Sequence, residues 1–173
     1  MIEKDTPGLD QLKAAENARF DIRIARDGVW YYQGTPINRM PLVKLFSTVL
    51  KRDQDGDFWL QTPVERGKII VDDAPFVAVE VNVAGAGRAQ RITFRTNLDE
   101  TVTLDQSHAL RMAFDSKTRE PSPYIMVRDN LEALILRPAF YELVEMAEET
   151  ERDGVAAIGV WSDDVFFPLG AIE

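Results

Sequence analysis

The chain has 173 residues, of which 45% are hydrophobic and 28% are charged, and it carries a net charge of −9 and no cysteine. This composition excludes a wholly disordered chain, and the lack of cysteine excludes disulfides, thiolate catalysis and zinc–thiolate centres. An acidic chain is poorly suited to bulk DNA or RNA, which proteins bind largely through Lys and Arg.

The sequence holds no signal for a membrane or for export. No apolar stretch approaches the roughly 20 residues that span a bilayer. Residues 1–18 lack the apolar core of a signal peptide. We therefore expect a cytoplasmic protein with no membrane partner.

The first half of the chain predicts strands interrupted by helices. A short helix is expected at residues 9–16, where Leu and Glu recur at helical spacing. A second helix is expected at residues 42–51, opened by Pro41, with the cations Lys51 and Arg52 at its C-terminal end. Alternating and β-rich runs predict strands at residues 20–24, 29–32, 58–62, 68–71 and 76–83.

The second half continues the same pattern. Gly85-Ala86-Gly87 indicates a hairpin turn, and Pro138 opens an amphipathic helix at residues 140–147. Many short strands with few helices predict an α+β fold with mainly antiparallel sheets. Strands are expected at residues 91–95, 101–104, 110–114, 124–127, 133–136, 155–161 and 165–167.

The two halves show signs of an internal duplication. Residues 37–56 align with residues 135–154, and both segments contain a helix opened by proline and closed by Asp-Gly. We expect two diverged copies of a strand-strand-helix-strand-strand unit, at residues 1–85 and 86–173. Coincidence between two similar hairpin units is the alternative. Identical pairs are Ile37 and Ile135, Arg39 and Arg137, Leu45 and Leu143, Asp55 and Asp153, and Gly56 and Gly154.

No catalytic or metal-binding motif survives inspection. His108 is the single histidine, and Ser107 beside it would point to the opposite face of a strand. Residues 53–57 look like a calcium loop, but Gly56 and Val64 do not match the Gly and Glu that an EF-hand requires. The glycines at residues 85–87 lack a phosphate-binding continuation. We expect no enzyme, no cofactor and no metal.

Arginines and aromatic residues are the better candidates for ligand contacts. Arg39 and Arg137 each precede a helix-opening proline, where a guanidinium can clamp a carboxylate or phosphate. An internal salt bridge is the alternative for both. Trp59, Trp161 and Tyr124 can stack a base or ring, although aromatic residues on strands more often belong to the core.

Distinctive runs occur at residues 57–65 (DFWLQTPVE), 72–77, 94–97, 131–135, 137–143 and 159–162 (GVWS). These runs resemble the bacterial domain of unknown function 1285 family, over about residues 20–170. The resemblance implies a second half similar to a pleckstrin-homology fold and a pocket between the two halves. It also implies a nucleotide-like or nucleic-acid-like ligand and a signalling role.

The resulting hypothesis is a non-enzymatic binding module, a regulatory sensor of a small anionic or nucleotide-like ligand held between the two units. The alternatives are a protein-protein interaction domain and a hydrolase that uses His108 or carboxylates. The candidate ligand-binding residues are Arg39, Trp59, Thr62, Glu65, Asn97, His108, Arg111, Arg137 and Trp161.

Overall fold

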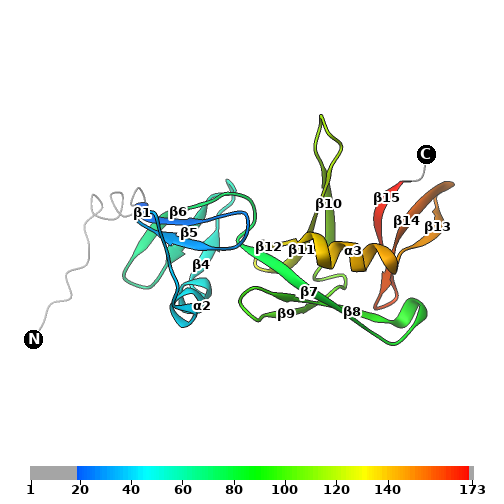
Figure 1. Ribbon diagram of the computed structural model, residues 1–173, viewed down its shortest axis with the longest axis horizontal. Helices are drawn as coiled ribbons and strands as arrows, with labels where there is room; N and C mark the ends of the chain where they lie inside the picture. Colours follow the sequence, from blue (N-terminus) through cyan, green and yellow to red (C-terminus); the bar gives the residue numbers. More distant parts are fainter. Residues whose placement is uncertain (1–18, 172–173) are drawn as a thin grey trace, which may run out of the picture. The chain divides into compact units, whose positions relative to one another are not determined.

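Strand β7 (Phe76–Ala84) shows where the chain divides. It pairs with β8 (Arg91–Thr96) and β12 (Leu131–Ile135), so it belongs to the second of two units. The first unit ends at Asp72 and the second begins at Asp73, whereas the boundary at residue 85 that the sequence predicts would leave β7 in the first unit. The computed structural model describes residues 19–171, and the helix expected at residues 9–16 lies outside them (Figure 1).

The first unit is built on a six-stranded sheet with the strand order β3-β2-β1-β6-β5-β4. Neighbouring strands are antiparallel except β1 and β6, which run parallel. Its elements are β1 (Arg19–Ile24), β2 (Trp30–Tyr32), β3 (Thr35–Pro36), α2 (Met40–Thr48), β4 (Leu50–Arg52), β5 (Phe58–Gln61) and β6 (Arg66–Val71).

Helix α2 begins as expected from its proline but ends early. Leu50 and Arg52 pair with Leu60 and Phe58 across the turn that follows, so residues 50–52 form strand β4. The expectation that Lys51 and Arg52 are cations at a helix end is therefore wrong. The helix packs on the sheet through Phe46, whose ring stacks on Trp30 with 6.3 Å between ring centres, and Trp30 is fully buried.

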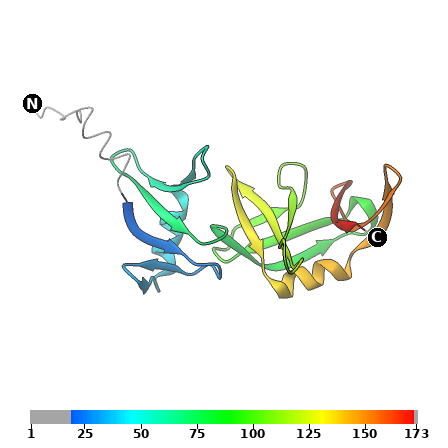
Figure 2. The ribbon, with the colours of Figure 1, turned by 90° about the horizontal axis from the view of Figure 1, so that it is seen from above.

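The second unit contains a six-stranded sheet, ordered β10-β11-β12-β7-β8-β9, and a three-stranded sheet, ordered β13-β14-β15. Only β7 and β12 run parallel among the pairs recorded in this unit. Helix α3 (Arg137–Glu145) follows β12 and runs along β7 (Figure 2). The remaining elements are η1 (Gly87–Ala89), β9 (Thr101–Thr103), β10 (Leu110–Phe114), β11 (Pro121–Arg128), β13 (Glu148–Arg152), β14 (Val155–Ser162) and β15 (Val165–Ala171).

The core of the second unit lies on the large sheet. Phe76, Phe94 and Ile125 come from three of its strands and are fully buried. Complete burial of such a side chain is worth roughly 1.5–3 kcal/mol in transfer free energy. Leu143 of α3 is also fully buried, whereas Tyr141 on the other side of the helix is exposed. The apolar stripe of α3 therefore covers the sheet.

The order of elements is repeated in the two units. A hairpin of β1 and β2 precedes α2, β4, β5 and β6, and a hairpin of β11 and β12 precedes α3, β13, β14 and β15. Both strand pairs after the helices turn at Asp-Gly, and Gly56 and Gly154 have φ values of 85° and 79°. The pairing differs, because β6 joins β1 whereas β15 belongs to the separate three-stranded sheet. The α+β, mainly antiparallel class is confirmed.

No helix within residues 19–171 is long and apolar enough to cross a membrane. The same residues contain no group of three or more acidic or histidine side chains placed to hold a metal ion.

Candidate functional site

The candidate residues of the first unit lie at three separate places. Arg39 is the exposed N-cap residue of α2, and its carbonyl accepts hydrogen bonds from the helix. Trp59 is 7% exposed, with the Arg66 guanidinium 3.8 Å from its ring centre. Thr62 and Glu65 lie in the turn between β5 and β6, where the Glu65 amide donates to Thr62 Oγ1 (3.0 Å).

Asn97 and His108 hold loops of the second unit. The amide of Val77 donates to Asn97 Oδ1 (3.2 Å), which ties the end of β8 to β7. His108 Nδ1 lies 2.9 Å from Asp105 Oδ1, and the His108 amide donates to the same oxygen. Partial burial acts to raise the pKa of Asp105, but hydrogen bonds from His108 and Ser107 outweigh it and leave that pKa below its ordinary value.

An Asp–His pair of this kind can orient an imidazole, but acyl transfer also needs a nucleophile on the other ring nitrogen. Ser107 does not supply one, since its recorded contact is a backbone hydrogen bond to Asp105. The arrangement serves to close the loop before β10.

The remaining predicted arginines form ion pairs. Arg111 donates twice to Glu132, from Nε (3.0 Å) and Nη2 (2.9 Å), and this contact raises the pKa of Arg111. Arg137 Nη2 lies 3.3 Å from Glu120 Oε1, and both side chains are exposed. The contact of Arg137 matches the alternative of an internal salt bridge, and its partner Glu120 lies in the hairpin between β10 and β11.

Trp161 lies in a charged pocket of the second unit. Its ring packs against Phe166, with 5.3 Å between ring centres and 58° between the planes. The Arg88 guanidinium lies 4.5 Å from the Trp161 ring centre, and the Arg152 guanidinium lies 5.7 Å from that of Phe166. These four side chains, from η1, β14, β15 and β13, form a row that we call the arginine–aromatic row.

The arginine–aromatic row lines a cavity of about 450 Å³. Gln106 and Thr150 add neutral polar groups to the wall, and Glu151 and Asp164 add two carboxylates. This volume lies within the range of small-molecule sites. The pocket therefore offers flat aromatic surface, guanidinium donors and a few acceptors in one place.

The two guanidiniums keep their charge available. Within residues 19–171, neither Arg88 nor Arg152 has a carboxylate at salt-bridge distance. Arg152 Nη1 makes one long contact, 3.5 Å, with the Phe166 carbonyl. Cation–π contacts of exposed arginines contribute about 0.5–1 kcal/mol each, and they orient the planar group without neutralising it.

Hydrogen bonds to backbone groups hold the row in place. The Asp164 amide donates to the Arg88 carbonyl (2.9 Å), and Gln90 Nε2 donates to the Trp161 carbonyl (2.9 Å). Ser162, which is completely buried, donates from Oγ to the Leu104 carbonyl (2.6 Å) and accepts from the Ile92 amide (3.0 Å). The turn after β7 and the hairpin of β14 and β15 are thereby fixed to each other.

Sequence reasoning missed Arg88, Arg152 and Phe166. Phe166 was visible as a strand residue close to Trp161, but its pairing with Trp161 depends on the hairpin register. Arg88 follows a glycine turn and Arg152 precedes one, and such positions predict exposure rather than a contact. Arg88 and Arg152 lie far apart in the sequence, so their spacing does not predict that they line one pocket.

The geometry defines an α+β protein of two sheet-based units with a ligand-sized, arginine-lined pocket in the second. Residues 7–74 match the model described as domain of unknown function (DUF1285), N-terminal domain. Residues 75–169 match the model described as protein of unknown function (DUF1285), C-terminal domain. The chain therefore belongs to the DUF1285 family, and the resemblance seen in the sequence is confirmed.

Two solved structures are similar to this chain. One is a DUF1285 family protein from Silicibacter pomeroyi DSS-3, with 51% identity over 90% of this chain and 82% of that chain, at a TM-score of 0.82. The other, from Shewanella baltica OS155, is 24% identical over 73% of this chain and 91% of that chain, at a TM-score of 0.58, which concerns the fold alone. No curated protein matches the chain.

Proposed function

We propose that this protein is a non-enzymatic binding module that senses a small anionic, nucleotide-like ligand at the arginine–aromatic row. The main support is that the guanidiniums of Arg88 and Arg152 lie over the rings of Trp161 and Phe166. Within the described residues, neither guanidinium has a carboxylate partner. The sequence hypothesis placed the ligand between the two units. The proposal places it within the second unit, on the predicted residue Trp161.

The chemistry of the wall favours a ligand with more than an anionic group. Planar guanidiniums bind phosphate or carboxylate oxygens through paired N–H donors. Glu151 and Asp164 in the same wall balance the two positive charges. A bare anion therefore gains little from net charge, whereas a ligand that also carries hydrogen-bond donors and a flat ring can use the carboxylates and Trp161.

The repeated order of elements supports the further proposal that the two units are diverged copies of one ancestor. Only the second copy carries the row, because β13 to β15 form a separate sheet there. The likeness to a pleckstrin-homology fold, the signalling role and the cytoplasmic location stay predictions.

The test is calorimetric titration of the full chain with adenosine monophosphate, adenosine and inorganic phosphate. Hydrogen bonds to charged groups contribute about 1.5–3 kcal/mol, so we expect Arg88→Ala with Arg152→Ala to weaken nucleotide binding by about tenfold or more. The matched control is Arg91→Ala with Arg119→Ala, two arginines that do not line the pocket.

We expect the nucleotide to bind more tightly than either adenosine or phosphate, since each of these retains only part of the contacts. Unchanged nucleotide affinity in the folded Arg88 and Arg152 double variant would overturn the proposal. Absence of binding by all three compounds at millimolar concentration would overturn it as well.

A further inference from the structure

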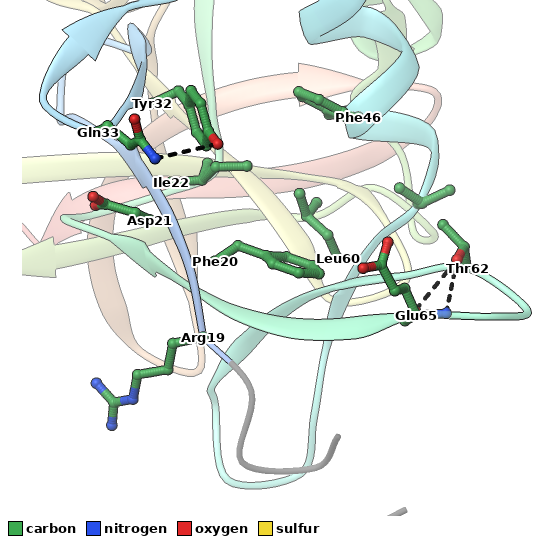
Figure 3. A pocket seen from close by; sticks show the side chains of 11 residues that line it. Arg19, Phe20, Asp21, Ile22, Tyr32, Gln33, Phe46, Leu60, Thr62 and Glu65 are labelled. Atoms are coloured by element: carbon green, nitrogen blue, oxygen red, sulfur yellow. Dashed lines mark hydrogen bonds between the residues drawn. The ribbon is translucent and has the colours of Figure 1, made fainter. Parts of the chain in front are cut away.

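A second cavity, of about 470 Å³, lies within the first unit (Figure 3). Its walls are mainly apolar, unlike those of the pocket at the arginine–aromatic row. This volume again lies in the range of small-molecule sites, which are apolar with a few placed polar groups. The apolar wall is formed by Phe20 and Ile22 of β1, Phe46 and Val49 at the end of α2, and Leu60 of β5.

The aromatic walls are fixed by their neighbours. A Cβ atom on Gly67 would lie 2.3 Å from Phe20 Cδ2, so the absence of a side chain there lets the Phe20 ring lie flat on β6. On the opposite wall, Phe46 stacks on the buried Trp30. Both rings are held without a ligand, which means that the cavity is preformed and that binding costs little reorganisation.

Two carboxylates, Glu65 and Asp21, and one guanidinium, Arg19, line this cavity, which leaves it with a net negative charge. The Thr62 amide donates to the Glu65 carbonyl (2.7 Å), and the Glu65 amide donates back to Thr62 Oγ1, so the backbone of Glu65 is held from both sides. Figure 3 shows the Glu65 side chain turned toward Phe20 and Leu60, while Arg19 points away from them. Within residues 19–171, no cation lies at salt-bridge distance from Glu65.

We propose that this cavity binds a small molecule with an apolar body and an ammonium group. The apolar body fills the space between Phe20 and Phe46, and the ammonium group pairs with Glu65. A carboxylate at the rim repels anionic ligands and contributes nothing to apolar neutral ones, so charge complementarity selects the amine. This site does not depend on the anion site proposed in the second unit.

The test compares phenylpropylamine with phenylpropanol, which share the apolar body and differ in charge. Nuclear magnetic resonance titrations of the full chain give both dissociation constants. An exposed ion pair contributes at most about 1 kcal/mol, so we expect the amine to bind about threefold more tightly than the alcohol. Glu65→Gln is expected to abolish this difference by weakening the amine alone, while the control Glu142→Gln on α3 leaves it intact.

Chemical-shift changes show which residues contact the amine, and they distinguish this cavity from the pocket at the arginine–aromatic row. Methyl signals of Ile22, Val49 and Leu60 are expected to shift, and those of Val155 in the second unit are not. The Arg88 and Arg152 double variant is expected to bind the amine as the wild type does. Equal affinity for amine and alcohol, an amine preference that survives Glu65→Gln, or shifts confined to other residues would each overturn the proposal.

Discussion

The indole Nε1 of Trp59 donates a hydrogen bond of 2.8 Å to Asp53 Oδ2. The other oxygen of Asp53 accepts from the amides of Asp55 and Asp57, both at 2.9 Å. The Asp53 carboxylate thus closes the turn between β4 and β5 and holds the buried Trp59 in place. The Arg66 guanidinium over the ring completes the contact. Trp59, expected to contact a ligand, is therefore held by the fold of the first unit.

Asp53 makes the stability of the first unit depend on pH. The Trp59 hydrogen bond is the main cause that lowers the pKa of Asp53, with help from the two amides and against partial desolvation. A carboxyl group whose pKa falls on folding stabilises the protein above its unfolded pKa, and that contribution is lost as pH falls through the folded value. We expect Asp53→Asn to destabilise the protein at neutral pH, and the difference from wild type to shrink below the ordinary value of 3.8.

Urea unfolding of both proteins at several pH values, followed by tryptophan fluorescence, measures this difference. Asp55→Asn is the control, because no hydrogen bond of its carboxylate is recorded within the described residues. A destabilisation by Asp53→Asn that stays constant down to acidic pH would contradict the assignment of the charge to this network.

Gly67 is required by the close approach of Phe20. Because a Cβ atom there would lie 2.3 Å from Phe20 Cδ2, the ring must move or the strands must separate. We expect Gly67→Ala to destabilise the first unit by about 1–3 kcal/mol, as overpacking usually does. Gly170→Ala in β15 is the matched control, since a Cβ atom there meets nothing within 4 Å. Its effect is expected within about 0.5 kcal/mol, and equal effects of both changes in denaturant unfolding would contradict the argument.

Ser162 connects three segments of the second unit through a single buried hydroxyl. Removing it leaves the Ile92 amide and the Leu104 carbonyl without that partner in a site where water is excluded. We expect Ser162→Ala to cost about 2 kcal/mol of unfolding free energy, the usual penalty for a buried unsatisfied group. Ser116→Ala, in the exposed tip between β10 and β11, is the control. A neutral effect of Ser162→Ala would contradict the assignment of this stability to the buried hydroxyl.

Much of the strand pattern could be predicted because apolar residues alternate in β1 and β8 with one face buried. Strands β4 and β13 were missed, because Leu-Lys-Arg and Glu-Glu-Thr-Glu-Arg lack that alternation. Each of these strands forms by pairing with the strand across an Asp-Gly turn. The local pattern of apolar and polar residues does not predict such pairing. Within the family-like run at residues 159–162, Gly159 has a structural role, since a Cβ atom there would lie 2.3 Å from the Phe167 carbonyl.

Of the candidate site, only Trp161 was predicted among the members of the arginine–aromatic row. The row depends on the register that pairs Trp161 with Phe166 and on η1 folding back to place Arg88 beside β14. Neither follows from residue spacing. Arg39 and Arg137 were favoured because they recur at equivalent positions, yet neither lines the cavity of the first unit or the pocket at the arginine–aromatic row.

Arg88→Lys separates the shape of the guanidinium from its charge. Lysine keeps the positive charge, but its ammonium group neither stacks flat on Trp161 nor offers paired N–H donors. We expect the affinity for adenosine monophosphate to fall about fivefold, since about 1 kcal/mol of stacking and bidentate contact is lost. Arg91→Lys is the control, because Arg91 is exposed, lies 3.9 Å from Asp163 and does not line the pocket. Full affinity in Arg88→Lys would show that charge alone suffices, and the stacked arrangement would then have no part in recognition.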